Sequence, residues 1–384
     1  MLVYILLPIV AGLPGFMLCR EKFGKLGRGI YCAYFALCLT IVEGMRYGIG
    51  YDYEAYRQTY LGFMFRDSVA DLSGYHMEKG YLLPQFILST AYPDPRVMFF
   101  VVAALISIAV AVWIYMYSPN PAVSAMAFAA WGPVFYTMNF LRQSFAALVV
   151  LYALVYIKKN DFLRYFALVL LATCFHWSAL FMIPFFFILK IRITPLVLVI
   201  YSTIATLLLI FSYDITDAFI KFSETMADKG YSAFVPSRYS HYLYGSVEFV
   251  NGIFIEYVIG YGLLFLFGFL FHRYIYKRDI DNKYAVAFMF FTLLLDFWGR
   301  KHAIISRLDL YFVFAATILF VPVALRGAYD WVDDKFKKHR RIGYVLTSCV
   351  MVGISVYFLG SMLLRGSNGC IPYTMWSLDT SALL

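Results

Sequence analysis

Apolar runs recur along the whole chain and limit its fold more than any other feature of the sequence. About twelve of them are long enough, or nearly so, to cross roughly 30 Å of hydrocarbon. Of the 384 residues, 62% are hydrophobic and 14% are charged, and a soluble core of this length could not bury so much apolar surface. We therefore predict an all-α, polytopic transmembrane helical bundle that forms a single membrane-embedded domain over residues 1–384. The runs lie at about 2–18, 30–43, 97–117, 122–138, 143–157, 162–175, 177–189, 195–212, 252–271, 284–298, 304–325 and 343–363.

Lysine and arginine residues gather in four of the connections between these runs. With twelve crossings, all four connections lie on one side of the membrane, which the positive-inside rule assigns to the cytoplasm. Both chain termini are then outside, and the net charge of +9 requires no nucleic-acid partner. The first run has no basic segment before it, so we expect a retained helix and no cleaved signal peptide. The four clusters are Arg20–Arg28, Lys158–Lys159, Arg273–Lys283 and Arg326–Arg341.

Two long connections lie on the opposite, outer side, at residues 43–96 and 213–251. Both are rich in tyrosine and contain glycines and charges, and their length is typical of functional loops or of disorder. We expect a folded cap or an amphipathic helix at the membrane interface. Within the first loop, the apolar segment Tyr81–Ala91 contains Pro84 and is too short to span, so we predict a re-entrant or interfacial segment.

Charged clusters at the outer ends of the apolar runs form the candidate site. Arginine offers a planar fork of donors that suits phosphate oxygens, and the outer side of a membrane protein should be poor in arginine. An anionic, lipid-linked ligand such as a polyprenol diphosphate would resolve that conflict. Simpler explanations stay open: ion pairs at the interface, arginines that extend to the headgroups, and a histidine bonded to a backbone carbonyl. The clusters contain Arg46 and Asp52 in Glu43–Tyr56, Arg142 in Asn139–Ser144, His176 in Phe175–Ser178, and Arg300, Lys301, His302 and Arg307 in Asp296–Asp309.

Several catalytic motifs are missing from the sequence. It contains no P-loop, no HExxH and no GxSxG motif, so ATP-driven transport and zinc or serine hydrolysis lose support. The six cysteines include no CxxC pair and indicate no disulfide framework. We expect neither a cofactor nor a metal ion.

The order of the motifs resembles the EpsG-like branch of the Wzy polysaccharide polymerases over roughly residues 40–315. That family usually has threonine before the aspartate of its first motif, where this chain has Tyr51, and the loop 213–251 matches no family element. The motifs that carry the resemblance are Arg46, Gly50-Tyr51-Asp52-Tyr53 with Tyr56, Glu78-Lys79-Gly80-Tyr81, Phe140-Leu141-Arg142-Gln143-Ser144-Phe145-Ala146, Phe175-His176-Trp177-Ser178-Ala179 and Arg307-Leu308-Asp309-Leu310-Tyr311-Phe312.

The resemblance implies a glycosyltransferase of the bacterial cytoplasmic membrane with its active site on the extracytoplasmic side. Such enzymes join oligosaccharide repeat units carried on undecaprenyl diphosphate, and they release undecaprenyl diphosphate without using a nucleotide. Membrane lipids, a flippase and a chain-length regulator are the further partners that it implies. We expect the diphosphate to be bound by Arg46, Arg142 and Arg307, with Arg300 in reserve. The expected general base is His176 first, and then Asp52 or Glu78. The residues expected to bind the rest of the substrate are Tyr53, Tyr56, Gln143 and Tyr311.

Two other functions fit parts of the same pattern. A single-sugar transferase that uses a polyprenyl-phosphate donor could employ Asp52-Tyr53-Glu54 with a divalent metal, and such an enzyme would lose activity in a chelator. A flippase for lipid-linked glycans would have charges along a path at mid-membrane and not at the outer ends of the helices.

Overall fold

Helices are the only regular elements in the described part of this chain. The structure is a computed structural model, and it describes residues 1–65, 72, 75, 77–211, 255–299, 307–366 and 369–376. The β contact found among these residues is a single isolated antiparallel bridge between Arg46 and Met375. The all-α prediction is therefore confirmed. The principal helices are α1 (Leu2–Leu18), α2 (Gly24–Gly44), α3 (Tyr53–Gly62), α4 (Lys79–Ala91), α5 (Pro95–Tyr117), α6 (Pro121–Ala130), α7 (Pro133–Asn139), α8 (Leu141–Lys158), α9 (Phe162–Thr173), η4 (Trp177–Met182), α10 (Phe185–Ile188), α11 (Pro195–Ile210), α15 (Ile255–Leu270), α16 (His272–Arg278), α17 (Lys283–Gly299), α19 (Leu310–Ala315), η7 (Ala316–Phe320), α20 (Val321–Lys335) and α21 (Arg340–Arg365).

Five stretches of helix in the described residues are long and apolar enough to cross a membrane. A sixth forms if α15 and α16, which are bent by 61° at their junction, are taken as one span. The other apolar helices are shorter than a full crossing, so the count of about twelve membrane helices stays a prediction. The five stretches are Glu21–Gly44, Pro95–Tyr117, Leu141–Lys158, Leu310–Lys335 and Arg340–Arg365.

Two of the predicted runs are interrupted in the structure. The run 122–138 divides into α6 and α7 because Gly132 has a φ of +100° and Pro133 follows it, a sequence that ends one helix and starts the next. The run 177–189 consists of the 3-10 helix η4 and the short α10, and the run 162–175 before it is α9. The segment Tyr81–Ala91 is helical as part of α4, and its re-entrant or interfacial position on the outer side stays a prediction.

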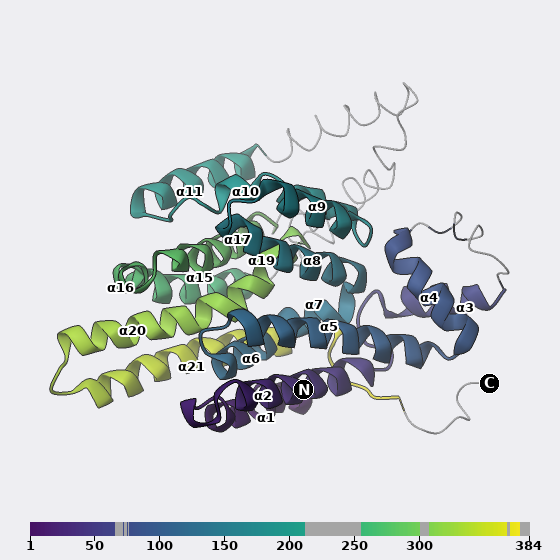
Figure 1. Cartoon of the computed structure of the whole chain (residues 1–384), viewed down its shortest axis with the longest axis horizontal. Coiled ribbons are helices and arrows are strands. Elements are labelled where there is room, and N and C mark those ends of the chain that lie inside the picture. Colours follow the sequence, from purple (N-terminus) through teal and green to yellow (C-terminus); the bar gives the residue numbers. More distant parts are fainter. Residues whose placement is uncertain are drawn as a thin grey trace.

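The basic connections gather at one end of the bundle. Lys158 Nζ lies 3.4 Å from Asp281, and Arg278 Nη1 lies 3.0 Å from Asp330, so three of the four clusters contact one another. The turn between α1 and α2, which holds the fourth, lies at the same left-hand end in Figure 1. The helices α3 and α4 lie at the opposite end.

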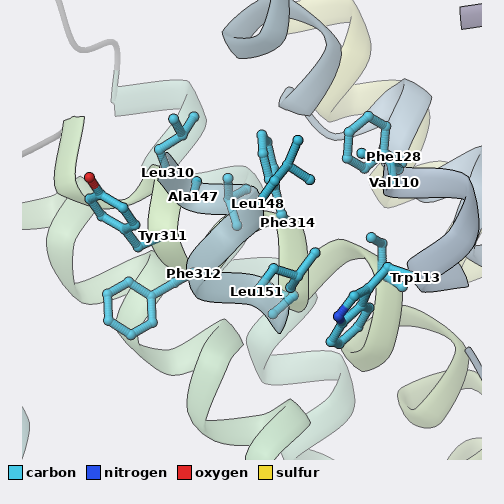
Figure 2. Close-up of a cluster of buried hydrophobic side chains, with 14 of the residues drawn as sticks. Val110, Trp113, Phe128, Ala147, Leu148, Leu151, Leu310, Tyr311, Phe312 and Phe314 are labelled. Carbon is cyan, nitrogen blue, oxygen red and sulfur yellow. The ribbon is translucent and has the colours of Figure 1, made fainter. Parts of the chain in front are cut away.

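The core joins helices from distant parts of the chain. Figure 2 shows Val110 and Trp113 of α5, Phe128 of α6, Leu151 of α8 and Phe314 of α19 in one apolar cluster. Tyr311 belongs to the same helix as Phe314, and its hydroxyl points away from the cluster. The core therefore positions a polar group at its edge.

Residues 369–376 fasten the connection between α2 and α3. Gly50 N–H donates to the carbonyl of Gly369 at 3.0 Å, and Tyr47 N–H donates to the carbonyl of Thr374 at 3.0 Å. The indole of Trp376 donates to the Gly44 carbonyl at 3.1 Å. The loop that carries Arg46 and Asp52 is thus held in place from the C-terminal side.

Close packing of α15 on α21 predicts a large effect of a single methyl group. A Cβ added at Gly260 would overlap the buried ring of Phe358, which stacks on Trp131 with 4.9 Å between ring centroids. We expect Gly260→Ala to lower the free energy of unfolding by about 1–3 kcal/mol. Gly262→Ala, whose Cβ would meet only Leu293 at 3.8 Å, is the matched control. Thermal unfolding in detergent measures both, and equal melting temperatures for the two variants would contradict the packing.

Candidate active site

The break between α7 and α8 collects the candidate residues. Phe140, with φ −98° and ψ 61°, leaves the helical conformation there. On one side of the break, the side-chain oxygen of Asn139 accepts the backbone N–H of Asp52 at 3.0 Å. On the other, the amide of Gln143 donates to the backbone carbonyl of Arg307 at 2.6 Å. The Arg307 guanidinium lies over the Phe140 ring, 5.0 Å from its centroid.

Arg142, in the first turn of α8, forms an ion pair with Glu78, the residue that precedes α4. The second oxygen of Glu78 accepts the backbone N–H of Trp177 at 3.3 Å. Gly80 N–H also donates to the Cys174 carbonyl at 3.0 Å. The segment before α4, the start of α8 and the turn after α9 therefore meet at the carboxylate of Glu78.

His176 lies in the turn between α9 and η4, outside the five candidate spans. Its Nδ1 accepts the backbone N–H of Ser178 at 3.3 Å and lies 2.6 Å from the Ser178 hydroxyl. That hydroxyl lies 2.8 Å from the hydroxyl of Tyr311, the group that points out of the apolar cluster in Figure 2. A chain of hydrogen bonds thus connects the imidazole to α19.

The electrostatics place these groups in one cluster. Burial raises the pKa of Asp52, and the charges of Arg307 and Arg142 act in the opposite direction. Burial lowers the pKa of His176 to about 4, with Glu78 opposing that shift and Arg142 and Arg307 adding to it. The structure therefore brings together Asp52, Glu78, Arg142, His176 and Arg307, and it keeps the imidazole neutral near pH 7.

Arg46 belongs to a neighbouring buried cluster. Its Nη1 donates to the carbonyl of Glu43, and its guanidinium lies over Phe99, 4.9 Å from the ring centroid. Its Nε and Nη2 have no hydrogen-bond partner within the described part of the chain. Arg46 is not among the charges that shift the pKa of Asp52 or His176. Tyr81 lies between the clusters, since its hydroxyl interacts electrostatically with both Arg46 and Arg142.

The predicted substrate-binding residues are all buried. Tyr53 stacks on Phe99 with 4.2 Å between centroids, and Tyr56 packs against Tyr81. Gln143 and Tyr311 make the internal hydrogen bonds given above. Their contacts with sugar stay predictions, and Arg300 lies outside the described residues.

Three residues of the site lie in the sequence motifs, but the sequence alone predicts no role for them. Asn139 holds the Asp52 amide, Phe140 supports Arg307, and Ser178 links His176 to Tyr311. The available signal for Asn139 was a polar residue between two apolar runs, and for Ser178 a hydroxyl two residues after the histidine. In the ranges that the structure describes, no group of three or more His, Cys, Asp or Glu side chains could hold a metal ion.

A family comparison covers this entire site. The model of the EpsG family matches residues 29–375. The chain belongs to the EpsG family. EpsG proteins are similar to Wzy-type polysaccharide polymerases, and membership implies a polysaccharide-polymerase-like glycosyltransferase activity. The matched range also includes Met375, whose segment fastens the loop before α3. Neither a curated protein nor a solved structure matches this EpsG-family chain.

The Arg142–Glu78 pair predicts a stability difference between two ion pairs. Glu78 is mostly buried, whereas Glu54 and Arg57 form an i,i+3 pair with 59% and 35% of their side chains exposed. We expect Glu78→Gln to lower the free energy of unfolding by about 1.5–3 kcal/mol, because it weakens a charged hydrogen bond at a partly buried guanidinium. Glu54→Gln, the matched control, should change it by less than about 1 kcal/mol. Equal thermal shifts for both variants would show that Glu78 does not hold Arg142.

Proposed function

We propose that this protein polymerises oligosaccharide repeat units carried on undecaprenyl diphosphate into a surface polysaccharide: O-antigen, capsule or exopolysaccharide. One observation carries the proposal. Arg142 and Arg307, which lie 165 positions apart in the sequence, reach the same cluster as Asp52, Glu78 and His176. Two guanidinium groups beside acid–base residues suit the transfer of a sugar away from a diphosphate.

The position of the cluster supports a reaction at the extracytoplasmic face of the cytoplasmic membrane. The basic connections lie at the end of the bundle that the positive-inside rule assigns to the cytoplasm. The candidate residues precede α4, start α8 and follow α9, and α4 lies at the other end in Figure 1. We therefore place the protein in the bacterial cytoplasmic membrane, with the site open to lipid-linked substrates of the extracytoplasmic leaflet.

The proposed reaction transfers the growing glycan to the incoming repeat unit. A hydroxyl of the incoming unit attacks the anomeric carbon of the chain, a C–O bond forms, and the bond from that carbon to the diphosphate breaks. Undecaprenyl diphosphate leaves with the electron pair, and Arg142 and Arg307 stabilise its developing charge. Asp52, Glu78 or His176 takes the proton of the hydroxyl.

Removal of one arginine tests the assignment. Arg142→Ala should lower polymer synthesis at least about 100-fold, because a preorganised donor to the departing diphosphate is lost. Arg57→Ala is the matched control, since Arg57 lies in α3 beside the same loop and, among the described residues, forms an ion pair only with Glu54. Purified protein is incubated with a lipid-linked repeat unit, and the ladder of products is measured. Wild-type ladders from properly inserted Arg142→Ala protein would remove this residue from the site.

A chelator distinguishes the polymerase from a metal-dependent transferase that uses a polyprenyl-phosphate sugar. The polymerase needs arginines and a base but no divalent ion, so we expect the same ladder with and without EDTA. Loss of activity in EDTA that Mg²⁺ or Mn²⁺ restores would favour the transferase. Transfer of intact lipid-linked units across vesicles without chain growth would favour a flippase.

A further inference from the structure

The hydrogen bonds at His176 determine which ring nitrogen carries the proton. A backbone N–H can only donate, so the Ser178 amide at 3.3 Å makes Nδ1 an acceptor. The Ser178 hydroxyl, 2.6 Å from the same nitrogen, then donates to it and accepts from Tyr311 at 2.8 Å. A neutral imidazole with a lone pair at Nδ1 has its proton on Nε2. The ring thus presents a donor, and its basic nitrogen is already occupied.

We propose that His176 donates a hydrogen bond from Nε2 to the departing diphosphate, and that Ser178 is the positioning residue that sets this tautomer. The proposal rests on the proposed function and reverses the predicted role of His176 as the first-choice general base. Neutral imidazole serves as an electrophilic donor in other enzymes.

The surroundings of His176 favour the neutral ring. Glu78 faces it from the segment before α4, Arg142 from the start of α8, and Arg307 from the segment before α19. Glu78 is already paired with Arg142. An imidazolium would add a third cation beside two guanidinium groups in a partly dry site, which the lowered pKa of His176 reflects. A neutral N–H donor adds no charge and still contacts a diphosphate oxygen.

The role of base then passes to Asp52. Glu78 is engaged by the Arg142 guanidinium and by the Trp177 N–H. Asp52 is held through its backbone N–H, and no residue in the described ranges donates a hydrogen bond to its carboxylate. In the transfer step, the acceptor hydroxyl gives its proton to Asp52, its oxygen bonds to the anomeric carbon, and the diphosphate leaves with the electron pair toward His176 and the arginines.

The His176→Gln substitution distinguishes a hydrogen-bond donor from a general base at position 176. The side-chain amide of His176→Gln can donate near the position of Nε2 but cannot accept a proton near pH 7. We expect it to retain polymer synthesis within about tenfold of wild type, whereas His176→Ala falls at least about 100-fold. His272→Gln, at the opposite end of the bundle, is the matched control. Equal losses in His176→Gln and His176→Ala would overturn the donor role.

The pH profile identifies the base independently. Because burial raises the pKa of Asp52, a base at this residue is protonated, and activity is lost, as the pH falls through that raised value. We expect the acid limb of the rate to persist in His176→Gln and to disappear from the residual activity of Asp52→Asn. Disappearance of the limb in His176→Gln would restore the histidine as base.

The tautomer of His176 can be measured without an assay of activity. Protein with ¹⁵N-labelled histidine in nanodiscs is examined by NMR, and the His176 signals are assigned by their loss in His176→Gln. We expect protonated Nε2 in the wild type and in Ser178→Thr. In Ser178→Ala, Nδ1 loses the hydroxyl at 2.6 Å and keeps only the long contact with the backbone N–H at 3.3 Å, so we expect a second tautomer beside the first, with a roughly tenfold lower kcat and the same KM. A proton on Nδ1, or a single unchanged tautomer with full activity in Ser178→Ala, would overturn the proposal. An inactive wild type with the expected tautomer would instead refute the polymerase function.

Discussion

Between α7 and α8 the backbone leaves the helical conformation for one residue, Phe140, and the groups on either side of this break hold the rest of the site. Asn139 binds the Asp52 amide, and Gln143 binds the Arg307 carbonyl. Buried polar groups in a membrane protein need partners within the protein. Here the need is met by loops from distant parts of the chain, which the break therefore draws to one place. The helix α8, which follows the break, packs with α5, α6 and α19 in the apolar cluster of Figure 2.

The same contacts explain how charged and titratable side chains are accommodated in a largely apolar protein. The Arg142–Glu78 pair holds the guanidinium in place, and preorganised charges are usually the largest single term in enzymatic transition-state stabilisation. Asp52 is positioned through its backbone N–H, and within the described part of the chain its carboxylate forms no ion pair. His176 is kept neutral by burial and by the two arginines. Arg142, Asp52 and His176 are thus each held by different interactions.

The positions of many helices follow from the lengths of the apolar runs alone, but the points at which a run divides into two helices do not. The predicted run 2–18 is α1 without change, although Pro8 and Pro14 lie inside the helix. The run 122–138 is divided because Gly132 adopts a positive φ, which hydropathy does not report. In the site, Arg142, His176 and Arg307 were predictable as charged or titratable residues at the ends of apolar runs. The link from Asn139 to Asp52 spans 87 positions and could not be predicted. Arg46, which follows α2, donates back to the Glu43 carbonyl of that helix and lies in a neighbouring cluster.

The central claim is that Arg142 and Arg307 together bind the diphosphate of a lipid carrier at the outer end of the bundle. A cryo-electron microscopy structure of the protein with bound undecaprenyl diphosphate measures this directly. We predict phosphate oxygens within about 3 Å of both guanidinium groups and a neighbouring contact from His176. A diphosphate bound elsewhere, at the basic connections or against lipid-facing helices, would contradict it.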